Sequence, residues 1–266
     1  MGELRAYRAL LGAQFRSVAS YRVSFLAEMA ANLGTTALDI ATVVVLFATA
    51  RAVAGFTLRE ALLIAGLSSL GFALADMLIG NVDHLKVYVR AGTMDVVLVR
   101  PLGALAQLLC MDLPIRKISR GLLSLAVLVA AVRLNHIDWT LTRAVLLVVT
   151  PLAGLVFFGA IFVLSASLAF WWVDSGEIGS AFTYGGRDFS SYPMPIFAGW
   201  FRTLFAYALG FAFVAYQPAL ILLGRTDPLG LPAWAGFLSP LVALPAAALA
   251  ALVWRAGIRQ YRSTGS

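Results

Sequence analysis

The chain has 266 residues, of which 61% are hydrophobic and 12% are charged, with a mean hydropathy of +0.88 and a formal net charge of +7. A soluble domain carries roughly 25% charged residues, so this composition indicates a polytopic membrane protein without a separate soluble domain. Because the basic residues stand in short blocks beside apolar segments, anionic lipid and membrane topology explain the positive charge, and we expect no nucleic-acid partner.

The first 22 residues predict an amphipathic helix that lies in the cytoplasmic interface of the membrane. Its apolar residues recur at steps of three and four, at Leu4, Tyr7, Leu11, Phe15 and Val18. The segment lacks the continuous apolar core of a signal peptide, so we expect it to be retained. A disordered basic leader is the alternative.

Two apolar segments follow, at about 28–50 and 60–80, and each is as long as the ~20 residues that a helix needs to cross the hydrocarbon core. The first contains Asp39, which we expect to face protein or a water-filled cavity, because a carboxylate in hydrocarbon is costly. Asp76 stands near the cytoplasmic end of the second. There, a solvated carboxylate at the end of a helix is the favoured interpretation.

The longest polar interruption, residues 81–120, carries six of the twenty lysines and arginines. The positive-inside rule places a segment of this density in the cytoplasm. Its centre, from Arg90 to Leu102, combines a helical turn, a glycine break, an amphipathic run and an Arg-Pro stop. This pattern predicts a short helix parallel to the membrane surface.

The third apolar segment, 122–132, is short, so we expect its helix to extend back toward Ile118 and Arg120 to reach out to the interface. The fourth span, 144–172, is uncharged throughout. The polar, glycine-bearing stretch 173–191 predicts a second cytoplasmic connection.

A fifth span is predicted from about Ile196, with Arg202 close to its cytoplasmic end. The sequence Tyr216-Gln217-Pro218 then predicts a break in the helix. The apolar piece that follows is too short to cross the membrane again, so residues 216–232 predict a re-entrant hairpin at the external face.

The sixth span is predicted at 234–254, and three arginines follow it. With both termini in the cytoplasm, the inner segments hold fifteen lysines and arginines and the outer segments hold five. This threefold bias predicts that both termini are cytoplasmic.

The loop between the second and third spans contains R-x-G-x-x-D-x-x-L-x-R-P and resembles the permeases of type 2 ATP-binding-cassette (ABC) exporters. In that family the loop holds the coupling helix, which docks on a separate ATPase subunit. The resemblance therefore implies that ATPase coupling involves Arg90, Gly92, Asp95, Arg100 and Pro101. The order of spans and the stretch from Tyr192-Pro193 to Gly224 also match, but the mid-span proline expected near 208–210 is absent.

The resemblance implies an all-α permease in which residues 1–266 form one transmembrane domain with six spans. It also implies a dimer with an identical or related permease chain, on two ATPase subunits that bind ATP and magnesium. The chain has no phosphate-binding loop, H-E-x-x-H or G-x-S-x-G motif, so we expect it to hold no cofactor or metal and to catalyse no reaction by itself. Candidates for the translocation path or the dimer interface are Asp39, Asp76, Arg202, Tyr216 and Pro218.

These features predict a transmembrane subunit of an exporter in the bacterial cytoplasmic membrane. A wall rich in Leu, Phe and Ala favours a hydrophobic or amphipathic substrate, such as a drug, an antibiotic or a lipid-like molecule. A permease for a lipid-linked glycan is the alternative within transport. A non-transporting membrane scaffold or an intramembrane hydrolase is the alternative from another class.

Overall fold

The computed structural model describes residues 22–49, 52–100, 103–110, 117–172 and 175–261. In the helix 22–49 it describes the backbone throughout but only some of the side chains. In these ranges the chain forms helices, turns and one isolated bridge between Val53 and Phe56. The predicted all-α class is confirmed for this part of the chain. Residues 1–21 of the predicted interfacial helix and Pro101 lie outside the described residues.

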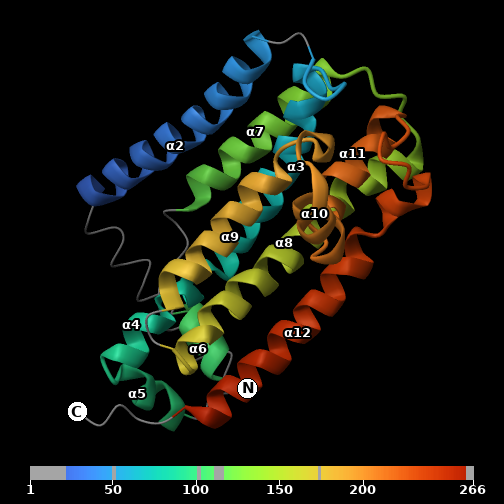
Figure 1. The fold of residues 1–266 in the computed structure, drawn as a ribbon. Coiled ribbons are helices and arrows are strands. Elements are labelled where there is room, and N and C mark those ends of the chain that lie inside the picture. Colours follow the sequence, from blue (N-terminus) through green and yellow to red (C-terminus); the bar gives the residue numbers. More distant parts are fainter. Residues whose placement is uncertain (1–21, 50–51, 101–102, 111–116, 173–174, 262–266) are drawn as a thin grey trace.

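Six longer helices pack side by side in a bundle (Figure 1). They are α2 (Arg22–Thr49), α3 (Leu58–Leu78), α7 (Ile118–Leu134), α8 (Leu141–Ser167), α9 (Gly176–Ser190) and α12 (Ser239–Gln260). The central helix is α8, which packs against α3, α9 and α12. Its buried phenylalanines, Phe157, Phe158 and Phe162, contribute to the hydrophobic core of the bundle.

Three of these helices are long and apolar enough to cross a membrane: α3, α12, and α8 together with the 3-10 turn η3 (Leu168–Phe170). Up to five spans result if two bent helix pairs each count as one. Six spans therefore stay a prediction. The helix α7 begins at Ile118, as expected from its short apolar centre.

The prediction of a polar connection at 173–191 was wrong for 176–190, which form α9 inside the bundle. Small residues let this helix approach its neighbours. A Cβ on Gly179 would stand only 3.2 Å from the Cβ of Ser165. Pairs of hydroxyl groups join α9 to its neighbours. Thr183 donates to Ser165 of α8 over 3.1 Å, and the hydroxyl oxygens of Ser190 and of Ser68 on α3 lie 2.7 Å apart.

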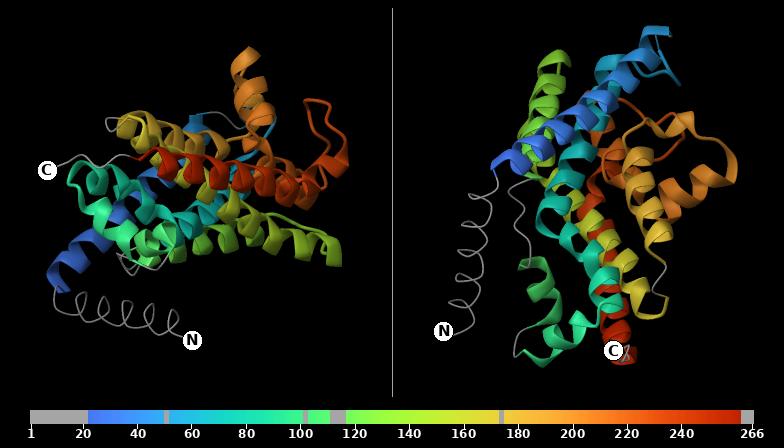
Figure 2. Two further views of the ribbon diagram at one scale, coloured as in Figure 1. Left: turned by 90° about the horizontal axis from the view of Figure 1, so that it is seen from below. Right: turned by 90° about the vertical axis from the view of Figure 1, so that its left-hand side faces the viewer.

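The region of the predicted fifth span, from Ile196, is not one continuous helix. This region consists of η5 (Met194–Ile196), α10 (Gly199–Arg202), the π-helix η6 (Thr203–Ala208), η7 (Phe211–Phe213) and α11 (Tyr216–Leu223). The segments Gly199–Ala208 and Phe211–Leu223 meet at an angle of 61°. Both views in Figure 2 show α10 projecting from the side of the bundle.

Gly210 makes the bend where the expected proline is absent. Its φ of +89° lies in the left-handed region, which favours glycine. Pro218 instead lies in the first turn of α11, where a missing backbone N–H costs no intrahelical hydrogen bond. The chain therefore breaks before Tyr216, and the predicted break at Tyr216-Gln217-Pro218 was several residues too late.

The short helices divide between the two ends of the bundle (Figure 1). One end, which we call the α4 end, holds η1 (Gly80–His84), α4 (Leu85–Arg90), α5 (Thr93–Val99) and α6 (Ala104–Cys110), and α12 finishes beside them. The opposite end, which we call the α11 end, holds α11 and η8 (Ala233–Phe237).

The crossing of α3 and α8 generates a test of packing. A Cβ on Gly71 would lie 3.0 Å from the Cα of Gly154, so the two backbones touch. We expect Gly71→Leu to destabilise the protein by about 2 kcal/mol through overpacking. Thermal unfolding in detergent measures the loss. The matched control is Gly121→Leu on α7, where nothing lies within 4 Å of the added Cβ, and an equal loss in both variants would contradict the close crossing.

Candidate functional site

The α4 end carries a helical elbow formed by α4 and α5. Gly92 joins the two helices with a φ of +67°, a conformation that glycine adopts without the penalty of a Cβ. On the inner side of the elbow, Met94 and Val97 are buried. On the outer side, Arg90 and Arg100 are exposed. The motif that the sequence singled out therefore forms two short helices with one packed face and one open face.

The outer face of the elbow is apolar as well as basic. Val87 is 53% exposed, Val96 is 56% exposed and Val99 is 86% exposed. Exposed apolar side chains gathered beside arginines are typical of a surface that binds another protein.

Two side-chain amides hold the elbow to its surroundings. Gln107 donates to the carbonyl oxygen of Val97 over 2.9 Å, and Asn81 donates to that of Leu108 over 2.5 Å. These bonds join α5, α6 and η1 into one unit. A force on the elbow would therefore act on all three.

Asp95 lies near Tyr261, which directly follows α12. Burial first, and then the nearby Asp95 carboxylate, raise the pKa of Tyr261. The Tyr261 ring also lies 6.1 Å from the ring of Phe170 in η3, and the ring of Phe170 lies 5.2 Å from that of Trp254 on α12. An aromatic cluster beside the elbow thus joins η3 to the end of α12.

Asp76 lies behind the elbow and is only 3% exposed. Its carboxylate accepts from Lys117 Nζ over 2.6 Å and from Arg120 Nη1 over 2.9 Å. The predicted solvated carboxylate was wrong, because the start of α7 packs over the end of α3. For the same reason Arg120, expected to reach out to the interface, instead pairs with Asp76.

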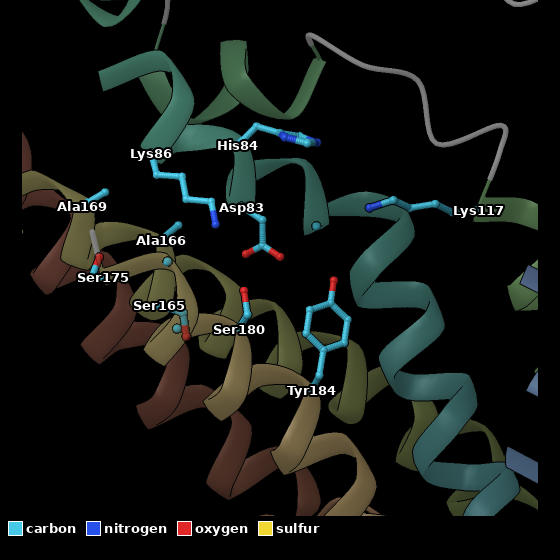
Figure 3. Close-up of a pocket in the computed structure, with 13 residues that line it drawn as sticks. Asp83, His84, Lys86, Lys117, Ser165, Ala166, Ala169, Ser175, Ser180 and Tyr184 are labelled. Carbon is cyan, nitrogen blue, oxygen red and sulfur yellow. The ribbon is translucent and has the colours of Figure 1, made fainter. Parts of the chain in front are cut away.

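A cavity of about 270 Å³ opens between η1, α4, α8 and α9, beside the Asp76 cluster (Figure 3). The side chains of Asp83, Lys86, Ser180 and Tyr184 point toward one another in it. Burial, and then the negative charge of Asp76, raise the pKa of Asp83 to about 6. The charges of Lys117 and Lys86 and a hydrogen bond with Tyr184 oppose this rise.

A second cavity, of about 230 Å³, lies between α2, α3, α7 and α9. It combines apolar side chains with the charged pair Arg187 and Asp188, whose Nη1 and Oδ1 atoms lie 3.5 Å apart. The polar, glycine-bearing sequence of 173–191 predicts a connection, so it gives no indication of a cavity wall here. The available signal was the stripe of small residues on one helical face, at Gly179, Thr183, Gly186 and Ser190.

The other candidate residues lie at or near the α11 end. Tyr216 donates to Asp227 Oδ1 over 2.9 Å, and Gln217 donates to Asp227 Oδ2 over 2.7 Å. Arg202 donates to the carbonyl oxygen of Phe197 over 3.0 Å. The structure therefore does not bring these residues together with Asp76.

A further contact fastens the α11 end. Arg225 pairs with Glu60 at the start of α3 over 2.8 Å, and its guanidinium carbon lies 4.4 Å from the centre of the Phe56 ring. The side chain of Asp39 is not among the described side chains. Within the described residues, no three His, Cys, Asp or Glu side chains are grouped so as to hold a metal ion.

The sequence matches one family model, described as "ABC-2 family transporter protein", over residues 33–265. No curated protein and no solved structure matches it significantly. The matched range includes the elbow, both cavities and the bent segment before α12.

The Asp76 cluster generates the second prediction. Asp76→Asn leaves two cations facing a neutral amide, and we expect a loss of stability of about 2 kcal/mol. The value is below that for a fully buried pair, because the Lys117 and Arg120 side chains are 33% and 26% exposed. Thermal unfolding in detergent measures it. Asp138→Asn is the control, since the Asp138 side chain is fully exposed and its Oδ2 lies 3.9 Å from Arg143 Nη1. An unchanged stability of the Asp76 variant would show that the cluster is dispensable.

Proposed function

The chain belongs to the ABC-2 family of transporter proteins, and we propose that it is the permease of an exporter for hydrophobic or amphipathic molecules. Membership of this family makes it a multi-pass membrane protein that associates with an ABC ATPase subunit. The observation that carries the proposal is the elbow at the α4 end. It is fixed to the bundle on one side and presents an open basic and apolar face on the other.

In this proposal the elbow is the contact for the ATPase, and the α4 end faces the cytoplasm. ATP and magnesium bind to the ATPase, and the permease itself catalyses no reaction. Two ATPase subunits serve a pair of permease chains, identical or related, in the cytoplasmic membrane of a bacterium. The basic residues of loop 81–120 support this orientation.

Three connections would carry a movement of the elbow into the bundle. The chain itself joins α4 to α3 through η1. The paired Asp76 joins α3 to α7. The Asp95 carboxylate on α5 acts electrostatically on Tyr261 at the end of α12. Closure of the ATPase subunits would therefore displace α3, α7 and α12 together, rather than the elbow alone.

The second cavity supports an amphipathic substrate. It lies against the middle of α3, because Ser69 lines it and Arg187 stacks on Phe72 at 5.6 Å from the ring centre. The helices α2, α3 and α7 contribute both apolar side chains and hydroxyl groups to its wall, namely Val43, Leu62, Ala65 and Val127 beside Thr42, Ser69 and Ser124. Charged and hydroxyl groups inside an apolar wall suit a molecule that has both characters.

The third prediction tests the ATPase contact. We expect the double variant Arg90→Ala and Asp95→Ala to lose co-purification with the ATPase and to lose substrate-stimulated ATP hydrolysis, because the outer face loses charge and the tie to Tyr261 is cut. Its folding is checked by thermal unfolding. Arg133→Ala, an exposed arginine at the α11 end, is the control. Full coupling in the double variant would place the ATPase contact elsewhere.

The fourth prediction concerns α11 as an exit gate. Leu222 is fully buried in α11, and Asp227 and Arg225 fasten this helix to the loop and to α3. In a Cys110→Ser background, we expect Leu222→Cys to react poorly with a membrane-impermeant thiol reagent at rest and faster during ATP turnover with substrate. Ala233→Cys, outside the bent pair, is the control for general accessibility. Equal labelling of Leu222→Cys in both states would leave α11 with a structural role only.

A further inference from the structure

The cavity at the α4 end has an excess of positive charge. Three cations, Lys86, Lys117 and Arg120, stand in or directly behind it, against two carboxylates, Asp76 and Asp83. The sum is +1 when Asp83 is ionised and +2 when it is protonated. Asp76 is already engaged by Lys117 and Arg120. Among the described residues, the charge that lacks a strong counterpart is therefore that of Lys86.

Lys86 extends into the cavity over the start of α9. Gly176 leaves the space for it, since a Cβ there would collide with the Lys86 side chain. Among the described residues, the Lys86 ammonium has no hydrogen bond and no ion pair within 4 Å. Its interaction with the Asp83 carboxylate is electrostatic, without a hydrogen bond. The side chain is half-buried, and its ammonium group is available to an anion in this cavity.

The remaining wall supplies hydrogen-bond donors. The hydroxyl groups of Ser180 and Tyr184 on α9 point into the same space as Lys86, and Lys117 enters it from the opposite side (Figure 3). Lysine ammonium and hydroxyl groups are frequent ligands of phosphate oxygens. The volume of about 270 Å³ has room for such a group.

The position of the cavity identifies the source of the phosphate. The apolar helices α3 and α8 with η3 end at Leu78 and Phe170. The cavity lies beside these ends, with Gly80 just after α3 and with Ser165, Ala166 and Ala169 from the last turns of α8 and η3 in its wall. Lipid headgroups lie at this depth, just outside the hydrocarbon core. A phosphodiester carries one negative charge, which matches the excess of +1.

We propose that this cavity binds the phosphate of an anionic phospholipid, with Lys86, Lys117 and Ser180 as donors. A lipid held there joins α4 of the elbow to α9 and α7. The binding proposal goes beyond the export function and does not depend on it, because lipid binding is measured without the ATPase and without transport.

Asp83 makes the binding depend on pH. It faces Asp76 on α3, Lys86 on α4, Lys117 before α7 and Tyr184 on α9. Its raised pKa, about 6, means that the carboxyl is ionised at pH 7.5 and repels phosphate, and is largely protonated at pH 5 and no longer does. Lipid affinity therefore rises as the pH falls through about 6.

The test uses the full-length protein in nanodiscs of phosphatidylcholine, titrated with fluorescently labelled phosphatidylglycerol. Lys86→Gln should lower the affinity for phosphatidylglycerol about tenfold, the loss expected for one charge-assisted hydrogen bond. Arg133→Gln, at the α11 end, should leave it unchanged. Thermal unfolding checks that both proteins are folded. If Lys86→Gln then binds phosphatidylglycerol as tightly as the unmodified protein, the proposal is overturned.

Two further arms separate the chemistry. Asp83→Asn should bind phosphatidylglycerol more tightly at pH 7.5 and lose most of the pH dependence. His84→Gln, which changes the histidine of the same wall, should keep that pH dependence. Excess inorganic phosphate should not displace the lipid. Displacement by inorganic phosphate would assign the site to a soluble phosphate, and an unaltered pH profile in Asp83→Asn would overturn the role of Asp83.

Discussion

The buried carboxylate of Asp76 is the interaction on which the α4 end depends. Withdrawing a carboxylate from water costs several kcal/mol, so the position is stable only with cations and hydrogen bonds around it. Lys117 and Arg120 meet this requirement, and in doing so they fix the start of α7 against the end of α3. The elbow and the cavity that holds Asp83 and Lys86 are built beside this junction, so their geometry follows from it.

The same constraint shapes the middle of the bundle in a different way. The helix α9 is polar and rich in glycine, yet one of its faces packs on the bundle, because Thr183 and Ser190 meet the hydroxyls of Ser165 and Ser68. Glycines bring the backbones close enough for these short side chains to meet. A polar helix can thus carry Arg187 and Asp188 against apolar neighbours, where a loop would leave its backbone groups without partners.

The two ends of the bundle are therefore fastened by different means. At the α4 end, the ion pairs of Asp76 fix the end of α3 against the start of α7, and Asp95 of the elbow lies near Tyr261 at the end of α12. At the α11 end, Asp227 and Arg225 hold a bent segment whose direction is set by Gly210. This division suits a permease that receives a force at one end and opens at the other.

The sequence by itself determined the helical class, the membrane setting, the start of α7 near Ile118 and the glycine break between α4 and α5, because hydropathy, helix length and turn chemistry are local properties. Only the tertiary structure decided that α9 is a bundle helix, that Gly210 bends the next segment and that Asp76 is buried with Lys117 and Arg120. Those outcomes depend on which distant residue supplies a hydrogen-bond or charge partner, and hydropathy along the chain does not contain that information.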